Sequence, residues 1–406
     1  MKFEKYLYWI LIFLLPTQLA FHYWPDYSFV FGIKVDYLSP TIFLTDVLLF
    51  LLAAISFPKI KKRLSVNAVV LGVVLVVLNL LIAKEPLIAL IKWVKILEMA
   101  FLFIYASINK HFNKMALISL FYSIIFFSLI GISQFILQRT IGGPFYLLGE
   151  RSFSVNTPGI ALANLLGRDY LRAYSTFPHP NALAGFLGAG GILILLLNSQ
   201  LKIFSKRKLW LFVLISSAAF LLTFSSGALI AGMLALIYYF LLRKNNFVVT
   251  KNSFFPAKKI FYIIVGLSLL MTVLPEFIKN IPLKSESITL RIDQAGIAGK
   301  MFVNNPLLGV GLNNFIPSAG RNITAGTSLF LQPVHNIYLL LLAEAGLVGF
   351  AFFIYLAGKF LSAKTKSAYM LPIFFVILTG FFDHYWFTLQ QNQLLLAFLL
   401  GISWKN

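Results

Sequence analysis

The feature that most constrains this chain is a series of apolar runs, each about 20 residues long, separated by short clusters of Lys and Arg. A helix needs about 20 mostly apolar residues to cross the hydrocarbon core of a bilayer. The runs therefore predict about twelve transmembrane helices. We expect them near residues 6–22, 38–57, 66–83, 86–108, 115–137, 181–200, 209–225, 227–242, 260–278, 335–357, 368–387 and 389–403.

The interruptions between these runs add two expectations. The run from Leu209 to Leu242 is too long for one span at 1.5 Å per residue, so we expect a tight turn at Ser225-Ser226-Gly227. Two longer segments, from about Gln138 to Pro180 and from about Lys279 to Val334, lack long apolar runs. Segments of this length in a compact protein are usually functional loops.

Composition supports an all-α polytopic membrane protein. Hydrophobic residues make up 59% of the chain and charged residues 12%, against about 25% charged in soluble proteins. The net charge of +21 does not indicate a nucleic-acid partner, because the basic residues cluster between apolar runs instead of forming a basic stripe. The chain has no cysteine, which excludes disulfides and thiolate metal sites.

The basic residues also predict an orientation. Most Lys and Arg fall in the segments on the side of the two termini, and cytoplasmic loops carry this excess. We therefore expect a multi-pass inner-membrane protein with both termini cytoplasmic, a retained first helix instead of a cleaved signal peptide, and both long loops extracytoplasmic. A P-loop, a GxSxG motif, an HExxH motif and a carboxylate cluster with metal spacing are absent from the sequence, so we do not expect ATP hydrolysis. We predict no cofactor and no metal ligands.

The strongest local signal is the stretch PVHNIYLLLLAEAGLVGF, in which Pro333 precedes His335 and Asn336 at the start of an apolar run. Free N–H groups and a partial positive charge at a helix start disfavour imidazolium and can hold phosphate oxygens. His335 is therefore a candidate proton acceptor, with Asn336 as a candidate substrate-binding neighbour. The alternative is an interfacial histidine with an ordinary hydrogen bond.

Glu344 does not fit as the catalytic companion of His335. It follows nine residues later, which places it half a turn away from His335 and deeper in a straight helix. An intramembrane carboxylate is costly, so we expect Glu344 to be a structural partner for a polar group on another helix. Gly346 and Gly349 fall near the face of His335, where a neighbouring helix could pack closely.

Arg291 is the first cationic candidate. It begins an amphipathic segment that Pro306, Gly309 and Gly311 end with a turn, and we assign the two glycines a structural role. The planar fork of a guanidinium binds two phosphate oxygens at once. An ordinary loop arginine is the alternative reading.

Four further candidates lie elsewhere in the sequence. Lys92 and Lys95, three residues apart, share one side of the fourth predicted helix, below its outer end. Such residues often mark a ligand site, although Lys92 could extend to the surface and Lys95 could pair with Glu98. Arg172 and His179 precede the sixth helix, where a capping turn is the alternative for His179.

Near the C-terminus, the stretch FFDHYWFTLQQNQ carries Asp383 and His384 close to the outer interface. An aromatic belt accounts for Tyr385 and Trp386. The sequence assigns no role to Asp383 and His384.

Four stretches resemble motifs of the O-antigen ligase and polymerase superfamily, in the same order. HNIYLLLLAEAGLVGF is similar to its His-Asn…Glu-x-Gly…Gly signature, and the stretch from Arg291 through Gly309-x-Gly311 to Phe315 looks like its large-loop motif. STFPHPNALAGF and LTFSSGALIAG are similar to two further segments. The resemblance implies a GT-C-like membrane glycosyltransferase, with residues 1–180 as an N-terminal part and 181–406 carrying the ligase/polymerase-like region at about 207–352.

The resemblance also implies an activity. Members move a glycan from an undecaprenyl-pyrophosphate carrier to an acceptor, which can be a glycan, a lipid or a protein, without a nucleotide sugar or an essential metal. His335 would be the general base on the acceptor hydroxyl, and Arg291 would hold the donor pyrophosphate. Arg172, Lys92 and Lys95 are our own additions as auxiliary phosphate ligands.

One departure from the family stands out, because the family often has arginine where this chain has Ser226. Lys92 or Lys95 could fill that gap. A polymerase that extends the glycan on its carrier shares the donor chemistry and remains open. A transporter or flippase of an anionic lipid or solute would instead need charged residues along a path through the membrane.

Overall fold

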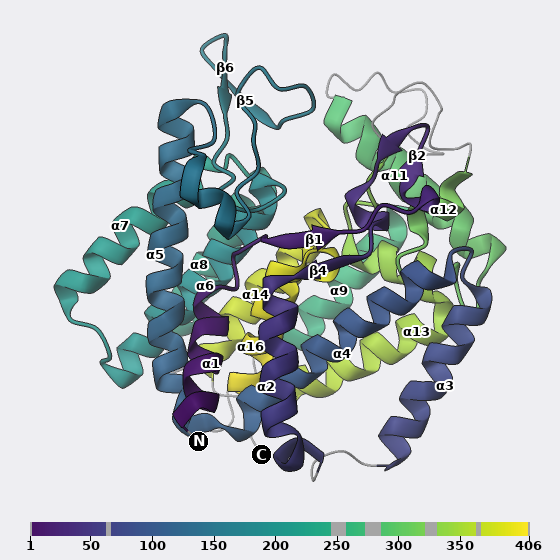
Figure 1. Cartoon of the computed structure of the whole chain (residues 1–406), viewed down its shortest axis with the longest axis horizontal. Coiled ribbons are helices and arrows are strands. Elements are labelled where there is room, and N and C mark those ends of the chain that lie inside the picture. The colour runs from purple at the N-terminus through teal and green to yellow at the C-terminus, as the bar shows by residue number, and fades with distance from the viewer. Residues whose placement is uncertain are drawn as a thin grey trace.

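A computed structural model describes residues 2–61, 66–244, 257–272, 286–320, 331–362 and 367–404. Within these residues the chain is mostly helical, and the helices form one bundle (Figure 1). The helices are α1 (Lys2–Phe13), α2 (Leu44–Lys61), α3 (Val66–Ile82), α4 (Pro86–Ile108), α5 (Asn113–Leu137), α6 (Pro180–Leu201), α7 (Lys206–Leu222), α8 (Ser226–Lys244), α9 (Ala257–Leu270), α11 (Glu286–Asn304), α12 (Phe315–Ala319), α13 (Ile337–Ser362), α14 (Ser367–Phe382), α15 (Tyr385–Thr388) and α16 (Gln390–Ser403).

In the part of the chain that the structure describes, short strands form three antiparallel two-stranded ladders, and short 3-10 turns accompany them. The ladders pair β1 (Ala20–His22) with β4 (Thr41–Phe43), β2 (Phe29–Val30) with β3 (Ile33–Lys34), and β5 (Leu162–Leu165) with β6 (Arg168–Leu171). The 3-10 turns are η1 (Asp26–Ser28), η2 (Asp36–Leu38), η3 (Lys110–Phe112) and η4 (Gly143–Leu148).

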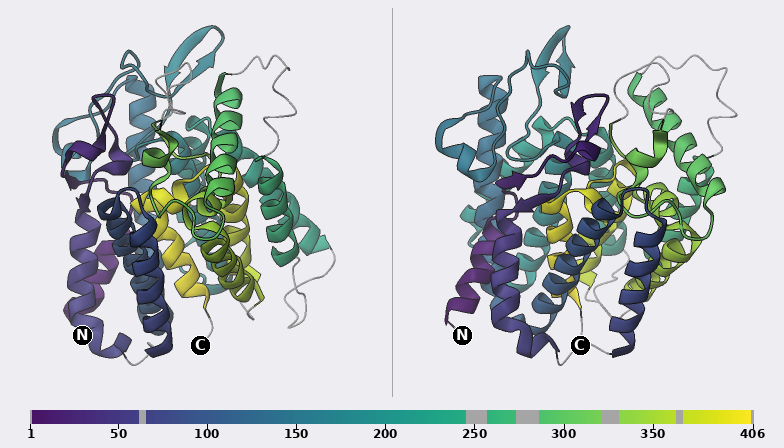
Figure 2. Two further views of the ribbon diagram at one scale, coloured as in Figure 1. Left: turned by 90° about the vertical axis from the view of Figure 1, so that its right-hand side faces the viewer. Right: turned by 45° about the vertical axis from the view of Figure 1, so that its right-hand side comes forward.

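Both chain ends lie at one end of the bundle, which we call the termini end (Figures 1 and 2). The β5–β6 ladder, α11 and α12 lie towards the opposite end, which we call the loop end. The two ends of the bundle therefore differ, with the chain termini at one end and the β5–β6 ladder, α11 and α12 towards the other.

Within the described residues, three helices are long and apolar enough to cross a membrane: Lys110–Leu137, Pro180–Leu201 and Ile337–Ser362. Shorter apolar helices run over Val69–Ile82, Ser226–Phe240 and Met370–Phe382. The chain is thus a largely helical protein with several apolar helices, as the sequence predicts. The count of twelve spans, the GT-C-like architecture and the division at residue 180 stay predictions, and parts of the ninth span and of the second long loop lie outside the described residues.

The first two predicted spans are wrong at the ends that face each other. Helix α1 ends at Phe13 and α2 begins at Leu44, and the chain between them contains a β ladder in which Ala20 pairs with Phe43. The ladder pairs the backbone N–H and C=O groups of two segments that are each too short to form a stable helix. An apolar, aromatic-rich run leaves the same mark in the sequence whether it is a helix or an edge strand.

The eleventh predicted span, 368–387, is also wrong at its end. Helix α14 stops at Phe382, and the chain turns at Asp383 and His384 before the short helix α15. The Asp383 carboxylate accepts a hydrogen bond from the backbone N–H of His384 at 2.7 Å. This hydrogen bond replaces the one that His384 N would form inside a helix. The polar pair Asp383-His384 therefore ends α14 within an apolar run.

The turn predicted at Ser225-Ser226-Gly227 is confirmed. Helix α7 ends at Leu222 and α8 begins at Ser226, and Phe224 between them has a left-handed φ of 48°. The amphipathic segment at Arg291 is likewise a helix, α11. It ends at Asn304, before the turn that the sequence places at Pro306 to Gly311.

Helix α13 is not straight, because Gly346 inside it has a φ of 59°. A Cβ at Gly346 would lie 2.4 Å from the carbonyl oxygen of Leu307, so the loop after α11 packs against bare backbone here. Glu344 binds that loop with both oxygens: Asn313 N donates to Oε2 at 2.8 Å and Phe315 N to Oε1 at 3.1 Å. Glu344 therefore has a structural role, as predicted, but its hydrogen-bond partners are backbone N–H groups of the loop and of the first residue of α12.

Gly309 and Gly311 have the structural role that the sequence gives them. Both have positive φ, 74° and 95°, in the loop that Glu344 holds. A Cβ at Gly311 would lie 2.6 Å from that of Ala83, which ties the loop to the end of α3 as well. The loop thus fixes the end of α11 relative to α13.

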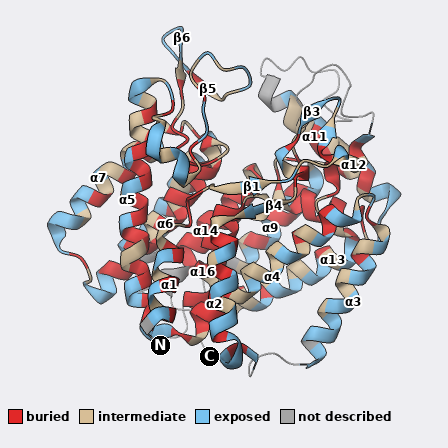
Figure 3. Ribbon diagram, viewed as in Figure 1, coloured by how far each residue is buried: buried red, intermediate tan, exposed pale blue. Residues whose placement is uncertain are grey.

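Helix α6 lies among α5, α7, α8, α14 and α16, and most of its first half is buried (Figure 3). A Cβ at Gly185 would lie 2.3 Å from the ring of Tyr385, and one at Gly188 would lie 2.3 Å from the ring of Phe375. These two glycines let α14 and α15 approach α6 closely. The approach brings the turn at Asp383 beside the start of α6.

Candidate functional site

Three histidines surround one aspartate at the starts and ends of helices. His179 precedes α6, His335 lies two residues before α13, and Asp383 and His384 form the turn after α14. The rings of His335 and His384 lie 5.2 Å apart between centroids. The sequence names His335 and His179 as candidates, and the structure brings them together with Asp383, to which the sequence assigns no role.

Hydrogen bonds fix the tautomer of His335. Its Nδ1 lies 2.8 Å from Oε1 of Gln294, a buried residue of α11. An amide oxygen can only accept, so Nδ1 carries the proton and donates it. The Nε2 of a neutral His335 is therefore the nitrogen with the free electron pair.

The other two histidines differ from each other. His384 Nδ1 lies 2.7 Å from Oγ1 of Thr388, whose hydroxyl donates to the His384 carbonyl at 3.1 Å, so His384 has the same tautomer as His335. His179 Nδ1 instead accepts from the backbone N–H of Asn181 at 3.1 Å, and its proton is on Nε2. This bond caps α6, so the alternative that the sequence offers for His179, a capping turn, is present, and its role as a substrate-binding residue stays a prediction.

Burial and charge keep the imidazoles neutral and the carboxylate ionised. Burial, with a smaller effect of Arg291, holds the pKa of His335 below its usual range, although Asp383 acts in the opposite direction. Burial also lowers the pKa of His384 to about 3 and that of His179 to about 3. Burial alone would raise the pKa of Asp383, but positive charge on the three histidines, in their imidazolium forms, and on Arg291 favours the ionised carboxylate and lowers that pKa.

Two cavities meet at Asp383. The smaller, about 120 Å³, is lined by Arg172, Arg291 and the start of α8 at Ser225 to Ala228, and we call it the arginine cavity. The larger, about 210 Å³, is lined by His179, His335 and His384, and we call it the histidine cavity. Asp383 and Tyr385 line both.

Both arginines of the arginine cavity are anchored on backbone carbonyls. Arg172 donates from Nε to the carbonyl of Thr223 at 2.5 Å, and Arg291 donates from Nη1 to that of Phe382 at 3.1 Å. Arg172 also donates to the side chain of Asn181 at 2.7 Å. Each guanidinium keeps further N–H groups, so the cavity presents two fixed cations beside the N-terminus of α8.

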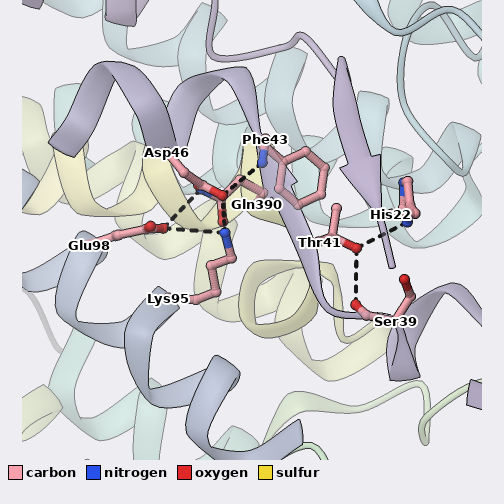
Figure 4. Close-up of polar contacts among 8 residues, drawn as sticks. All are labelled: His22, Ser39, Thr41, Phe43, Asp46, Lys95, Glu98 and Gln390. Atoms are coloured by element: carbon pink, nitrogen blue, oxygen red, sulfur yellow. Dashed lines mark hydrogen bonds and ion pairs between the residues drawn. The ribbon is translucent and has the colours of Figure 1, made fainter. Parts of the chain in front are cut away.

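Lys92 and Lys95 line the histidine cavity instead of the arginine cavity. Lys95 forms ion pairs with Asp46 and Glu98, so the predicted Lys95–Glu98 pair is present at 3.6 Å (Figure 4). Lys92 donates to the carbonyl of Phe387 and lies 4.0 Å from the centroid of its ring. Neither lysine fills the gap that Ser226 leaves, and Arg172 lies there.

Asn336 has a structural role. Its side-chain oxygen accepts from the N–H groups of Tyr338 and Leu339 and caps α13. Its amide nitrogen donates to the hydroxyl of Ser268 at 3.0 Å and to a backbone carbonyl. Asn336 is 1% exposed and lines neither cavity, so we leave it out of the substrate contacts.

His335, Asp383 and His384 form a set of groups that could hold a metal ion, since one donor atom from each lies within 4.8 Å of the others. Metal-binding histidines often donate their second ring nitrogen to a fixed acceptor, as His335 and His384 do here. The carboxylate, however, already accepts from His384 N and from Asn181 Nδ2 at 2.9 Å. The same arrangement suits an ion-free proton acceptor with its charge partner.

The fold and site define a polytopic membrane protein with cationic and imidazole groups at one end of its bundle. A profile of the O-antigen ligase family matches residues 211–354, which include Arg291 and His335, and this match supports the resemblance to the O-antigen ligase superfamily. This is a family of membrane glycosyltransferases. No curated protein and no solved structure matches the chain.

Proposed function

We propose that this chain transfers a glycan from undecaprenyl pyrophosphate to an acceptor hydroxyl, in the manner of an O-antigen ligase. The observation that carries the proposal is the pair of cavities joined at Asp383. One offers two arginines to a pyrophosphate, and the other offers the unprotonated Nε2 of His335 to a hydroxyl. The anomeric carbon would lie where the two meet.

The reaction would be a single displacement with inversion. The acceptor oxygen forms a bond to the anomeric carbon while the bond from that carbon to the pyrophosphate oxygen breaks. The hydroxyl proton passes to Nε2 of His335, and the pyrophosphate leaves with the bonding electrons. A neutral imidazole is needed for this step, which agrees with the lowered pKa of His335.

Two groups would stabilise the charges that develop. Asp383, held ionised, lies beside the imidazolium that forms on His335. Arg172 and Arg291 lie where negative charge grows on the leaving pyrophosphate. Fixed charges of this kind act most strongly in a site from which water is excluded.

A product assay tests the proposal. Purified chain is incubated with a labelled undecaprenyl-pyrophosphate glycan and a membrane extract that contains acceptors. A ligase gives a labelled glycan on a new acceptor, whereas a polymerase gives a ladder still on the carrier. Transport of intact donor into vesicles with neither product would contradict glycosyl transfer.

His335→Ala tests the proposed base. We expect the rate of transfer to fall by roughly 10² to 10⁴, the usual contribution of a positioned general base. Binding of the donor should stay close to that of the wild type, because the arginine cavity is intact. Activity equal to wild type would remove His335 from the mechanism.

Labelling of single cysteines tests the proposed side of the membrane. We expect the loop end to be extracytoplasmic, and the chain has no cysteine of its own. Leu166 lies in the turn between β5 and β6 and is fully exposed. A cysteine in its place, Leu166→Cys, should react with an impermeant maleimide added outside the cell. Lys61→Cys, at the last residue of α2, should react only after the cells are lysed. The reverse pattern would contradict the proposed orientation.

A further inference from the structure

We propose that the histidine cavity contains a subsite for an uncharged sugar ring, formed by Gln18 and Gln391. Gln18 lies before β1 and Gln391 lies in the first turn of α16, and both line the cavity together with His335. Calling this ring the acceptor's sugar rests on the proposed function. The binding of the ring itself does not.

The subsite lies outside the part of the chain that matches the ligase family. The matched residues, 211–354, supply His335 to the cavity, whereas Gln18 and Gln391 come from the two ends of the chain. The family match therefore says nothing about this wall. Its chemistry has to come from the contacts of its residues.

Two amide atoms on this wall are buried without a partner among the described residues: Nε2 of Gln391 and Oε1 of Gln18. Gln391 is 1% exposed. Native proteins pair nearly all buried polar groups, and each exception needs an explanation such as a ligand. Here one unpaired atom donates and the other accepts, which is the pattern that a hydroxyl group completes.

The cations near this wall are held by other groups, which argues against an anionic ligand. Lys92 donates to the carbonyl of Phe387. Lys95 is held by Asp46 and Glu98, and Arg151 is held by Asp36. Figure 4 shows the first of these clusters beside His22 and Thr41. This wall therefore offers amides and hydroxyls, in contrast to the free guanidinium N–H groups of the arginine cavity.

The neighbouring groups are held in fixed orientations. The ring of His22 stacks on Trp24 at 5.4 Å, with 13° between the planes, and its Nδ1 lies 3.0 Å from Oγ1 of Thr41. A preorganised wall of neutral polar groups suits a rigid ligand with several hydroxyls. A sugar ring bound here would share one cavity with Nε2 of His335 and could present a hydroxyl to it.

Saturation-transfer NMR on the full chain in nanodiscs tests the subsite. The probes are methyl β-D-glucopyranoside and methyl β-D-galactopyranoside, with glucuronate as the charged comparison. We expect saturable binding of at least one methyl glycoside and weaker binding of glucuronate. Gln391→Met keeps the side-chain volume and removes the amide, and it should weaken binding by about tenfold, the effect of one lost hydrogen bond. Gln18→Met should act in the same way.

Ser128→Ala is the matched control. Ser128 also has a buried hydroxyl without a partner among the described residues, but it lines neither cavity. This variant should bind the glycosides as the wild type does. Gln391→Met should also melt no lower than the wild type, because an unpaired amide contributes no bond to the unliganded fold. A lower melting temperature with unchanged glycoside binding would give Gln391 a structural role and overturn the subsite.

The subsite and the proposed function fail in different ways. Transfer activity with an acceptor KM that Gln391→Met leaves unchanged would sink the subsite and leave the transferase. Glycoside binding that depends on Gln391, in a chain without transfer activity, would sink the transferase and leave the subsite. Absence of saturable glycoside binding to the wild type, or glucuronate binding as tight as that of the glycosides, also overturns the subsite.

Discussion

The arginine cavity and the histidine cavity share Asp383 but differ in how they satisfy their polar groups. In the arginine cavity, two guanidinium groups are anchored on carbonyls and form no ion pair with any residue that the structure describes. In the histidine cavity, Lys95 is neutralised by two carboxylates and Lys92 is held by a carbonyl, and most of the other polar groups are imidazoles and amides. The arginine cavity is therefore suited to bind a charged group, whereas the histidine cavity is suited to bind hydroxyl groups and to accept a proton.

Asp383→Asn tests the group that the two cavities share. The isosteric amide keeps an acceptor for His384 N but removes the charge beside His335, so we expect transfer to slow by about 10². Asp383 raises the pKa of His335, and its loss lowers that pKa further. The base must be neutral, so the acid limb of the pH–rate profile, which lies below pH 6.5 in the wild type, should move to still lower pH. An acid limb that moves to higher pH would contradict this assignment.

Arg172→Gln tests the charge of the arginine cavity. A hydrogen bond to a charged group contributes about 2 kcal/mol, so kcat/KM for the donor should fall by roughly thirtyfold. Arg291→Gln should have a similar effect. Ser226→Arg, which restores the residue common in the family, should recover much of the loss in Arg172→Gln but none of the loss in His335→Ala. Failure of that rescue would show that Arg172 does not have the role of the arginine that the family often has at position 226.

Lys95→Met should act on stability and leave donor use unchanged. It leaves Asp46 and Glu98 without their cation in a largely buried site, and breaking such a pair costs about 3–5 kcal/mol in other proteins. The melting temperature should therefore drop while the donor KM stays constant. Lys92→Met is the control, because Lys92 donates to a carbonyl and should destabilise less. A raised donor KM in Lys95→Met would return the lysine to the donor site.

Removal of divalent metals should have the smallest effect. We expect EDTA to leave the transfer rate unchanged, because His335 acts through a proton in the proposed mechanism. Loss of activity that Zn²⁺ or Mn²⁺ restores would assign His335, Asp383 and His384 to a metal site. The histidine cavity would then also bind a charged species, and the proposed difference between the two cavities would be wrong.

The apolar runs and the helix-start signals carried much of the fold. Pro180 is the first residue of α6 and His179 caps that helix as its neighbours suggest, whereas Pro333 lies four residues before the start of α13 at Ile337. These signals are local, because each depends on residues within one turn of the chain. The β1–β4 ladder was missed because aromatic residues near an interface look alike in a helix and in a strand.

The site was only partly predictable for a different reason. His335 and Arg291 lie in recognisable stretches, but the neutralisation of Lys95 depends on Asp46, far away in the sequence. The position of the Arg172 side chain depends on its hydrogen bond to the carbonyl of Thr223, which lies in another loop. Asp383 became a candidate when the fold brought three imidazoles around it. Contacts between distant segments leave no pattern in a single sequence.

The clamp between Glu344 and the backbone of Asn313 and Phe315 has a consequence for the route of the lipid. Two hydrogen bonds to one buried carboxylate, next to the bare-backbone contact between Gly309 and Gly346, close the seam between α13 and that loop. A polyprenyl chain cannot slip through a seam that is tied in this way. A carrier that docks its pyrophosphate in this protein must thread its tail between other helices and leave this corner as a fixed wall.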